Sequence, residues 1–281
     1  MTTRRFVQCD VFSSVPIKGN GLAVVVDGDG LSDRQMQEFA AWTNLAETTF
    51  LQAPTDPQAD YKLRIFSPAR EMLFAGHPTL GSCAAWLHAG GVPKDAGIIQ
   101  QECAIGLVPI DMRGPVPAFV APPTPIAPLP DANRARLIAA LGLDDSDVIR
   151  SAHLTNGPEW QVLELKNAQA VLDVDASNVR WPEYQGVSLI GAHASGSDCD
   201  YEVRNVSPSS GMNEDPITGS LNSALAMWMH HEGRLTRDIV VAQGTCLGRL
   251  GRVYISVDAQ HPGRVLIGGE TRIVIEGTVQ L

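Results

Sequence analysis

The chain has 281 residues, of which 44% are hydrophobic and 19% are charged, and its formal net charge at pH 7 is -10. This composition suits a globular protein with a sizeable core and argues against a disordered chain. Lys and Arg form no block, so neither nucleic acid nor an anionic membrane surface is an expected partner.

The cysteines indicate a reducing compartment. Their number is odd and none has CxxC spacing, which argues against a disulfide framework and against a zinc site. The N-terminus lacks the apolar stretch of a signal peptide, and no apolar run approaches the length of a bilayer span. We therefore expect a cytoplasmic protein. The cysteines are Cys9, Cys83, Cys103, Cys199 and Cys246.

The first part of the chain predicts short strands and one capped helix. Ser32 is followed three residues later by Gln35, the spacing of a capping box, and apolar residues then recur at helical spacing. Alternating or β-branched segments predict the strands. These strands are expected at residues 6–12, 22–26, 48–51 and 61–66.

Two helices are expected to be buried on every side. Residues 78–89 and 216–231 are apolar on nearly every helical face, and glycines stop them at Gly90 and Gly233. A further amphipathic helix over residues 134–142 ends at a glycine. Short strands dominate the rest of the chain, so the pattern indicates a sheet curled around a central helix in each half.

The chain also repeats itself. R-I-F-S-P at Arg64 returns as R-N-V-S-P at Arg204, and H-P-T-L-G-S at His77 returns as D-P-I-T-G-S at Asp215. A fainter echo, T-N-x-x-E, begins at Thr43 and again at Thr155. Such long-period similarity indicates a duplicated unit. We expect the two related halves to meet, with both proline turns lining one cleft.

The proline-rich stretch at residues 115–130 is the expected crossing between domains. We predict an N-terminal domain over residues 1–117 and a C-terminal domain over residues 118–281. A strand near residues 270–281 is expected to cross back to the first domain.

The proline turns suggest an anion site. Proline is favoured at the first position of a helix, so His77 and Asp215 are predicted N-caps before Pro78 and Pro216. Two helix N-termini could then hold a carboxylate or an oxyanion through their backbone N–H groups. The alternative is that both residues are purely structural caps.

Glu47 is the candidate general acid or base. It is an isolated acid in the apolar segment N-L-A-E-T-T-F, and a carboxyl group in apolar surroundings has a raised pKa, which suits proton transfer near neutral pH. An exposed charge at a strand edge is the alternative.

Glu159, its echo, follows Gly157-Pro158 and is expected at the surface. His230 and His231 are interpreted as a solvated helix end.

Five motifs in order resemble the phenazine-biosynthesis isomerase (PhzF-like) family. The resemblance implies an α+β, diaminopimelate epimerase-like fold with two pseudo-symmetric domains, each a β-barrel wrapped around a central helix. It also implies a homodimer that uses neither a metal nor an organic cofactor. The motifs are G-N-G-L-A-V-V at Gly19, N-L-A-E-T-T-F at Asn44, R-I-F-S-P-A-R-E at Arg64, F-A-G-H-P-T-L-G-S at Phe74 and E-D-P-I-T-G-S at Glu214.

The resemblance also implies which residues form the site. Glu47, His77 and Asp215 would be catalytic, with Glu47 as the acid/base. The residues expected to bind substrate are Asn20, Gly76, Thr218, Gly219 and Ser220. Two departures concern the same regions. Gly21 replaces the family's usual proline, which should loosen the loop that carries Asn20. Leu221-Asn222 replaces a frequent Ala-His pair, which should remove a polar group near the pocket.

The expected function is a cofactor-independent isomerase that moves a proton on a small carboxylate-bearing substrate, with a ring like that of a dihydro-hydroxyanthranilate. A catalytically silent protein that binds small carboxylates is one alternative. An amino-acid epimerase or dehydratase of the same fold is another, and it is disfavoured because the thiol pair of such epimerases is replaced at the Gly76-His77 turn and at Asp215.

Overall fold

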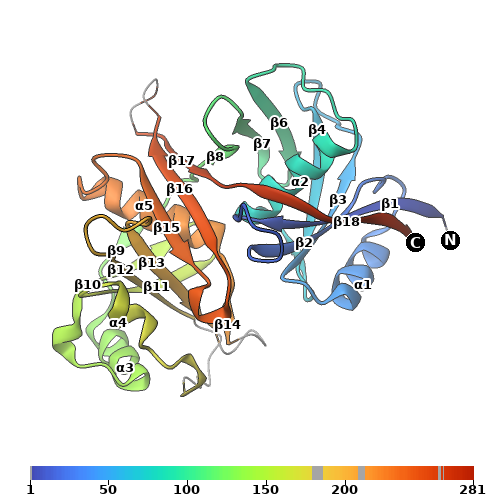
Figure 1. The fold of residues 1–281 in the computed structure, drawn as a ribbon. Helices are drawn as coiled ribbons and strands as arrows, with labels where there is room; N and C mark the ends of the chain where they lie inside the picture. Colours follow the sequence, from blue (N-terminus) through green and yellow to red (C-terminus); the bar gives the residue numbers. More distant parts are fainter. Residues whose placement is uncertain (1, 179–185, 208–212, 259–260, 262) are drawn as a thin grey trace. The chain divides into compact units, whose positions relative to one another are not determined.

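The computed structural model describes residues 2–178, 186–207, 213–258, 261 and 263–281, and the chain divides into two compact units (Figure 1). Unit 1 spans Met1–Val120 and Gly268–Leu281, and unit 2 spans Ala121–Ile267. The division thus falls after Val120, and the chain returns to unit 1 at Gly268. Pro208, which ends the second copy of the repeated motif, lies outside the described residues.

Unit 1 is one sheet in the order β18-β1-β2-β3-β4-β6-β7-β8, with β5 paired to β4. The pairs β2–β3 and β4–β6 are parallel, and the others are antiparallel. The strands are β1 Thr3–Val11, β2 Asn20–Val25, β3 Glu47–Gln52, β4 Tyr61–Phe66, β5 Glu71–Met72, β6 Ile98–Cys103, β7 Gly106–Asp111, β8 Ala118–Val120 and β18 Thr271–Gln280, and the helices are α1 Asp33–Thr43 and α2 Gly76–His88.

Unit 2 contains the order β9-β10-β11-β12-β13-β15-β16, with β14 paired to β13. The pairs β11–β12 and β13–β15 are parallel. The strands are β9 Ile126–Ala127, β10 Val148–Thr155, β11 Glu159–Leu165, β12 Val187–Ala192, β13 Tyr201–Val206, β14 Glu214–Asp215, β15 Ile239–Gln243, β16 Gly251–Val257 and β17 Val265–Gly268; the α-helices are α3 Asp131–Leu141, α4 Ala168–Leu172 and α5 Gly219–His231; and the 3-10 helices are Asp145–Asp147, Ala176–Asn178 and Thr245–Leu247.

The two units repeat one topology. In each, antiparallel strand pairs alternate with parallel steps: β1-β2 corresponds to β10-β11, β3-β4 to β12-β13, and β6-β7 to β15-β16. The long helix of each unit connects the strands of its second parallel step, α2 between β4 and β6 and α5 between β13 and β15. The duplication expected from the repeated motifs is therefore present in the fold.

The long helices are buried, as their sequences predict. In α2, Leu80 and Ala85 are at most 1% exposed, and the helix packs against β1, β2, β3 and β18 (Figure 1). In α5, Ala224 and Ala226 are fully buried. Small side chains let strands approach a helix from several directions, which is why the sheet can curl around it. Both helices stop before glycines with positive φ, Gly90 and Gly233.

The predicted N-caps of these helices are wrong. The first helix begins at Gly76 after the extended residue Ala75, so Pro78 lies inside the first turn, where a missing N–H leaves no helical bond unmade. The second helix begins at Gly219 with Thr218 as its N-cap, while Asp215 belongs to β14 and pairs with Asn205. Neither cap residue makes a side-chain capping bond.

The echo T-N-x-x-E also has no common structure. Thr43 and Asn44 end α1, with Asn44 in the left-handed region at φ 53, whereas Thr155 ends β10. Glu47 opens β3, but Glu159 opens β11, which is the counterpart of β2. This echo is therefore not part of the duplication.

The loop before β2 is anchored by Asp10, and the loosening expected from Gly21 stays a prediction. Asp10 Oδ2 accepts the backbone N–H groups of Lys18 and Gly19 at 2.9 and 2.8 Å. Gly21 lies in β2 opposite Asp10 and is not part of a loop. A Cβ atom at Gly19 would lie 2.3 Å from the Val11 carbonyl oxygen, so this turn requires glycine there.

The other sequence-based elements agree with the structure. Helix α1 has the predicted capping box, since Ser32 Oγ accepts the Gln35 N–H and Gln35 Oε1 accepts the Ser32 N–H. Helix α3 ends at Gly142 in the left-handed region, as predicted. Throughout the described ranges, every helix is too short or too polar to cross a bilayer.

Candidate functional site

Glu47 and His77 meet in unit 1. Glu47 is the first residue of β3, and His77 is the second residue of α2. Glu47 Oε2 lies 3.3 Å from His77 Nε2, and the two side chains are 18% and 6% exposed. The parallel pairing of β2 with β3, and the packing of α2 against both strands, bring the two residues together from distant parts of the sequence.

His77 is neutral at physiological pH. Burial lowers the pKa of its imidazole to about 3, because a charged ring loses its hydration in the interior. Its Nε2 atom makes no hydrogen bond of normal geometry within the described residues. The contact is therefore one between a carboxyl group and a neutral imidazole, an arrangement in which the carboxyl group can hold a proton and the imidazole can accept or donate a hydrogen bond.

Glu159, which echoes Glu47 in the sequence, also lies beside a histidine but is exposed. Glu159 Oε2 lies 3.6 Å from His153 Nε2, but the Glu159 side chain is 67% exposed. Its predicted surface position is confirmed. The two Glu–His contacts have similar distances and differ mainly in burial.

A second polar cluster surrounds Asp215 in unit 2. Thr218 Oγ1 donates to Asp215 Oδ2 at 2.5 Å. Gln243 Nε2 donates to Thr218 Oγ1 at 3.0 Å, and Gln243 Oε1 accepts the Thr218 N–H at 3.1 Å. Gln243 is fully buried and ends β15, so the strand that follows α5 supplies a polar group to the start of the same helix.

Asn222 and Asn205 complete this cluster, and both were missed as site residues. Asn222 Nδ2 donates to the Thr218 carbonyl and to Gln243 Oε1, at 2.9 and 2.8 Å. Asn205 Nδ2 donates to Thr218 Oγ1 at 3.2 Å. The departure at position 222 was expected to remove a polar group, but Asn222 supplies one. A polar residue inside the apolar run L-N-S-A-L-A is the signal that could have identified it.

The remaining predicted residues are distributed between the two units. In unit 1, Asn20 opens β2 at 3% exposure and Gly76 opens α2. In unit 2, Gly219 and Ser220 open α5, and Asn156 Nδ2 donates to the Ser220 carbonyl at 2.7 Å. Backbone N–H groups in the first turn of a helix lack intrahelical acceptors, so both helix starts present donors.

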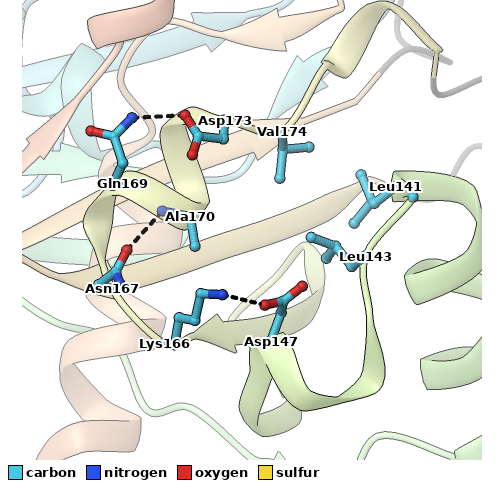
Figure 2. Close-up of a pocket in the computed structure, with 10 residues that line it drawn as sticks. Leu141, Leu143, Asp147, Lys166, Asn167, Gln169, Ala170, Asp173 and Val174 are labelled. Carbon is cyan, nitrogen blue, oxygen red and sulfur yellow. Dashed lines mark hydrogen bonds and ion pairs between the residues drawn. The ribbon is translucent and has the colours of Figure 1, made fainter.

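None of the predicted site residues lines the surface pocket of about 340 Å³ between the end of α3 and α4 (Figure 2). Its polar side chains bond to one another: Lys166 Nζ to Asp147 at 2.6 Å, and Gln169 Nε2 to Asp173 at 2.7 Å. These groups are already satisfied, so we assign no activity to this pocket. Nor do the described residues contain a group of His, Cys, Asp or Glu side chains that could hold a metal ion.

Comparisons with known proteins agree along nearly the whole chain. The model of a family described as phenazine biosynthesis-like proteins matches residues 9–277. Antisense-enhancing sequence 1 of Schizosaccharomyces pombe is 36% identical, with 99% of each chain covered. The trans-2,3-dihydro-3-hydroxyanthranilate isomerase of Pseudomonas aeruginosa is 31% identical over 99% of each.

The solved structures extend this agreement to the fold. A PhzF-family protein of Bacillus anthracis matches with a TM-score of 0.83 and 22% identity, covering 100% of both chains. Together with the repeated topology, this likeness confirms the predicted α+β fold class.

Proposed function

The chain belongs to the family of phenazine biosynthesis-like proteins and is an isomerase, and we propose that it moves a proton on a small cyclic carboxylate with Glu47 as the acid and base. The single observation that carries the proposal is the sheltered contact of 3.3 Å between Glu47 and a neutral His77. A carboxyl group in a site with little water can both remove a proton and return it.

The proposed step is balanced without an oxidant or a reductant. The Glu47 carboxylate takes a proton from a ring carbon, and the electron pair of the broken C–H bond spreads over the adjacent conjugated system. The protonated Glu47 then delivers the proton to another carbon of the same system. Because His77 is neutral, it can accept or donate a hydrogen bond at Glu47 without adding a charge beside it.

The other predicted residues are proposed to bind and orient the substrate. Asp215 would contact a polar group of the substrate, assisted by Ser220. The backbone N–H groups at Gly76 and Gly219 begin their helices, and donors of this kind stabilise a carboxylate or the charge that develops in a transition state. Asn20 and Thr218 would support these contacts.

The first experiment measures exchange of substrate protons with solvent deuterium by NMR. Cyclic carboxylic acids would be screened, beginning with trans-2,3-dihydro-3-hydroxyanthranilate, the compound in the name of the Pseudomonas aeruginosa relative. We expect Glu47→Gln to lower the exchange rate at least about 100-fold, since general acid–base catalysis contributes about 10²–10⁴-fold. Ligand binding should remain close to that of the wild type.

Glu159→Gln is the matched control, because Glu159 also lies beside a histidine but is 67% exposed. This variant should exchange at the wild-type rate. Exchange by Glu47→Gln at the wild-type rate would refute the assignment of Glu47. If small carboxylates raise the melting temperature but no compound reacts, the protein is a silent binder. Loss of optical rotation from proline or diaminopimelate analogues would identify an epimerase.

Two further properties belong to the same proposal. We propose a homodimer, supported by the resemblance and by the exposed apolar side chains of Val274 and Ile275 on β18. Light scattering coupled to size-exclusion chromatography tests it, and a monomer mass would overturn it.

We also propose a reducing cytoplasmic location, supported by buried thiols such as Cys9 and Cys83, whose pKa values burial raises to about 12. Fluorescent-fusion imaging with cell fractionation tests this, and recovery outside the cytoplasm would overturn it.

A further inference from the structure

We propose that Gln243 is a positioning residue that acts through the Thr218 hydroxyl to hold Asp215 as an ionised hydrogen-bond acceptor. The inference deepens the proposed function and rests on it, because it gives a defined role to Asp215, one of the residues proposed to bind substrate. It follows from the direction of each hydrogen bond in the cluster formed by Asn205, Asp215, Thr218, Asn222 and Gln243.

Backbone groups fix the orientation of both amide side chains. A backbone N–H can only donate, so the atom of Gln243 that lies 3.1 Å from Thr218 N must be the oxygen Oε1. A backbone carbonyl can only accept, so the Asn222 atom that lies 2.9 Å from Thr218 O must be the nitrogen Nδ2. Asn222 then donates a second bond to Gln243 Oε1 at 2.8 Å, in agreement with both assignments.

The nitrogen of Gln243 therefore has to face the other side of the cluster. It lies 3.0 Å from Thr218 Oγ1 and 3.3 Å from the backbone carbonyl of Asp215, which again can only accept. Asn205 Nδ2 donates to the same hydroxyl oxygen at 3.2 Å. Two donors thus occupy both lone pairs of Thr218 Oγ1.

Only one direction is then left for the hydroxyl proton. It points to Asp215 Oδ2, and Asp215 accepts the bond. A hydrogen bond to the ionised form of a carboxyl group favours that form. The polar groups behind this bond are shielded from water, because Gln243 and Asn222 are 0% exposed and Thr218 is 7% exposed, while Asp215 itself is half-buried.

The charged groups on the neighbouring strands do not change the assignment of Asp215 as the acceptor of the Thr218 hydroxyl proton. Arg204 in β13 and Glu214 in β14 are bound to each other at 2.7 Å, and both side chains are at most 3% exposed. The contributions of β15 and α5 to the cluster, Gln243 and Asn222, are uncharged. An Asp215 that is fixed as an acceptor can contact only a donor on the substrate, so the substrate group that meets it should be an amine or a hydroxyl.

Unit 1 offers a natural control for this arrangement. Gln101 Nε2 donates to Thr79 Oγ1 at 3.2 Å, and Gln101 is fully buried, as Gln243 is in unit 2. The Thr79 hydroxyl donates to the Ala75 carbonyl at 2.9 Å, and no carboxylate receives it. The same Gln–Thr pair is therefore present in both units, but only the pair in unit 2 ends on an acid.

The test follows the titration of the Asp215 carboxyl carbon by ¹³C NMR in the full-length protein. We expect the titration midpoint to move up by about one pH unit in Thr218→Val and in Gln243→Met, and to stay unchanged in Thr218→Ser, which keeps the hydroxyl. Gln101→Met should destabilise unit 1 without moving the Asp215 midpoint.

Activity provides a second readout. With a substrate that exchanges, kcat/KM should fall about 10-fold in Thr218→Val and in Gln243→Met, and the double variant should lose no more than either single variant. Full additivity of the two losses would overturn the inference. An unchanged Asp215 titration midpoint in folded Thr218→Val would also overturn the inference. This variant is sufficient for the test if Gln243→Met does not fold. The titration needs no substrate, so failure of the Glu47 experiment and failure of this one are distinguishable.

Discussion

His77 shows at the residue scale how burial determines chemistry. Its imidazole has a pKa of about 3 in the folded protein, against 6.5 as the ordinary value. The unfolded chain therefore binds one more proton between these values, so His77 contributes stability above pH 6.5 that is lost as the pH falls towards 3. Unfolding of unit 1 should become easier over this range.

We expect His77→Asn to remove this contribution. Its free energy of unfolding should fall less steeply with acidification than that of the wild type, by up to about 1.4 kcal/mol per pH unit between pH 6 and 4. Denaturant unfolding at several pH values measures the slope. Equal slopes in the two proteins would mean that His77 is charged in the folded state.

The residues of the candidate site were predictable to different degrees. Glu47 could be singled out because it is the one acid in a local apolar segment, and its partial burial agrees with that interpretation. Gln243 could not, because its role depends on contacts with Thr218 and Asn222, which are 25 and 21 residues away in the chain. Local sequence patterns carry no information about which polar group a distant strand will meet.

At the scale of elements, the duplication contains a matched pair of ion pairs. Arg64 in β4 binds Glu71 in β5 at 2.7 Å, with side chains 20% and 40% exposed. Arg204 in β13 binds Glu214 in β14 at the same distance, with side chains 3% and 2% exposed. Arg204 also donates to the backbone carbonyls of Val171 in α4 and of Val174, which follows α4.

This difference in burial predicts different costs for the same substitution. Arg204→Met leaves Glu214 charged and buried and should destabilise unit 2 by about 3–5 kcal/mol. Arg64→Met should destabilise unit 1 by no more than about 1 kcal/mol, because its partners Glu71 and Asp33 are 40% and 86% exposed and water screens both pairs. Hydrogen exchange of the amides in β13 and β4 measures both effects. Equal losses in the two units would show that burial does not set the strength of these pairs.

Helix interiors were easier to predict than helix starts. The apolar faces of α2 and α5 and their terminal glycines are local signals, and the structure agrees with them. The starts depend on the strand that enters each helix. Asp215 pairs with Asn205 in the sheet, so α5 begins only at Gly219. In unit 1, α2 already includes His77 and Pro78. Similar motifs thus occupy different positions relative to their helices.

At the scale of the whole molecule, the architecture was predictable because the duplication leaves motifs in the sequence and the family resemblance specifies the fold. The pairing of strands was not predictable in detail. The echo at Thr43 and Thr155 suggested a correspondence between Glu47 and Glu159 that the sheet order contradicts, since β3 corresponds to β12. Topology, rather than short motifs, identifies equivalent residues in a duplicated protein.

The topology also predicts how the chain depends on its last strand. Unit 2 is one continuous segment, but unit 1 is completed by β18, which pairs with β1 along Thr3–Val11. The two ends of the chain lie side by side, with Leu281 N donating to Thr2 O at 3.1 Å (Figure 1). Val279 and Leu281 pack against the core cluster that contains Met36 and Phe39.

Deletion of residues 270–281 should therefore destabilise unit 1 selectively. The loss uncovers the edge of β1 and part of an apolar core, so amides in β1 and α1 should exchange rapidly, while those in β11 and α5 keep their protection. Hydrogen exchange with mass spectrometry reads both units in one sample. Thr278→Ser is the control, because Thr278 is exposed and β18 remains in place. If the truncated protein protected β1 as well as the full chain does, β18 would not be an integral strand of unit 1.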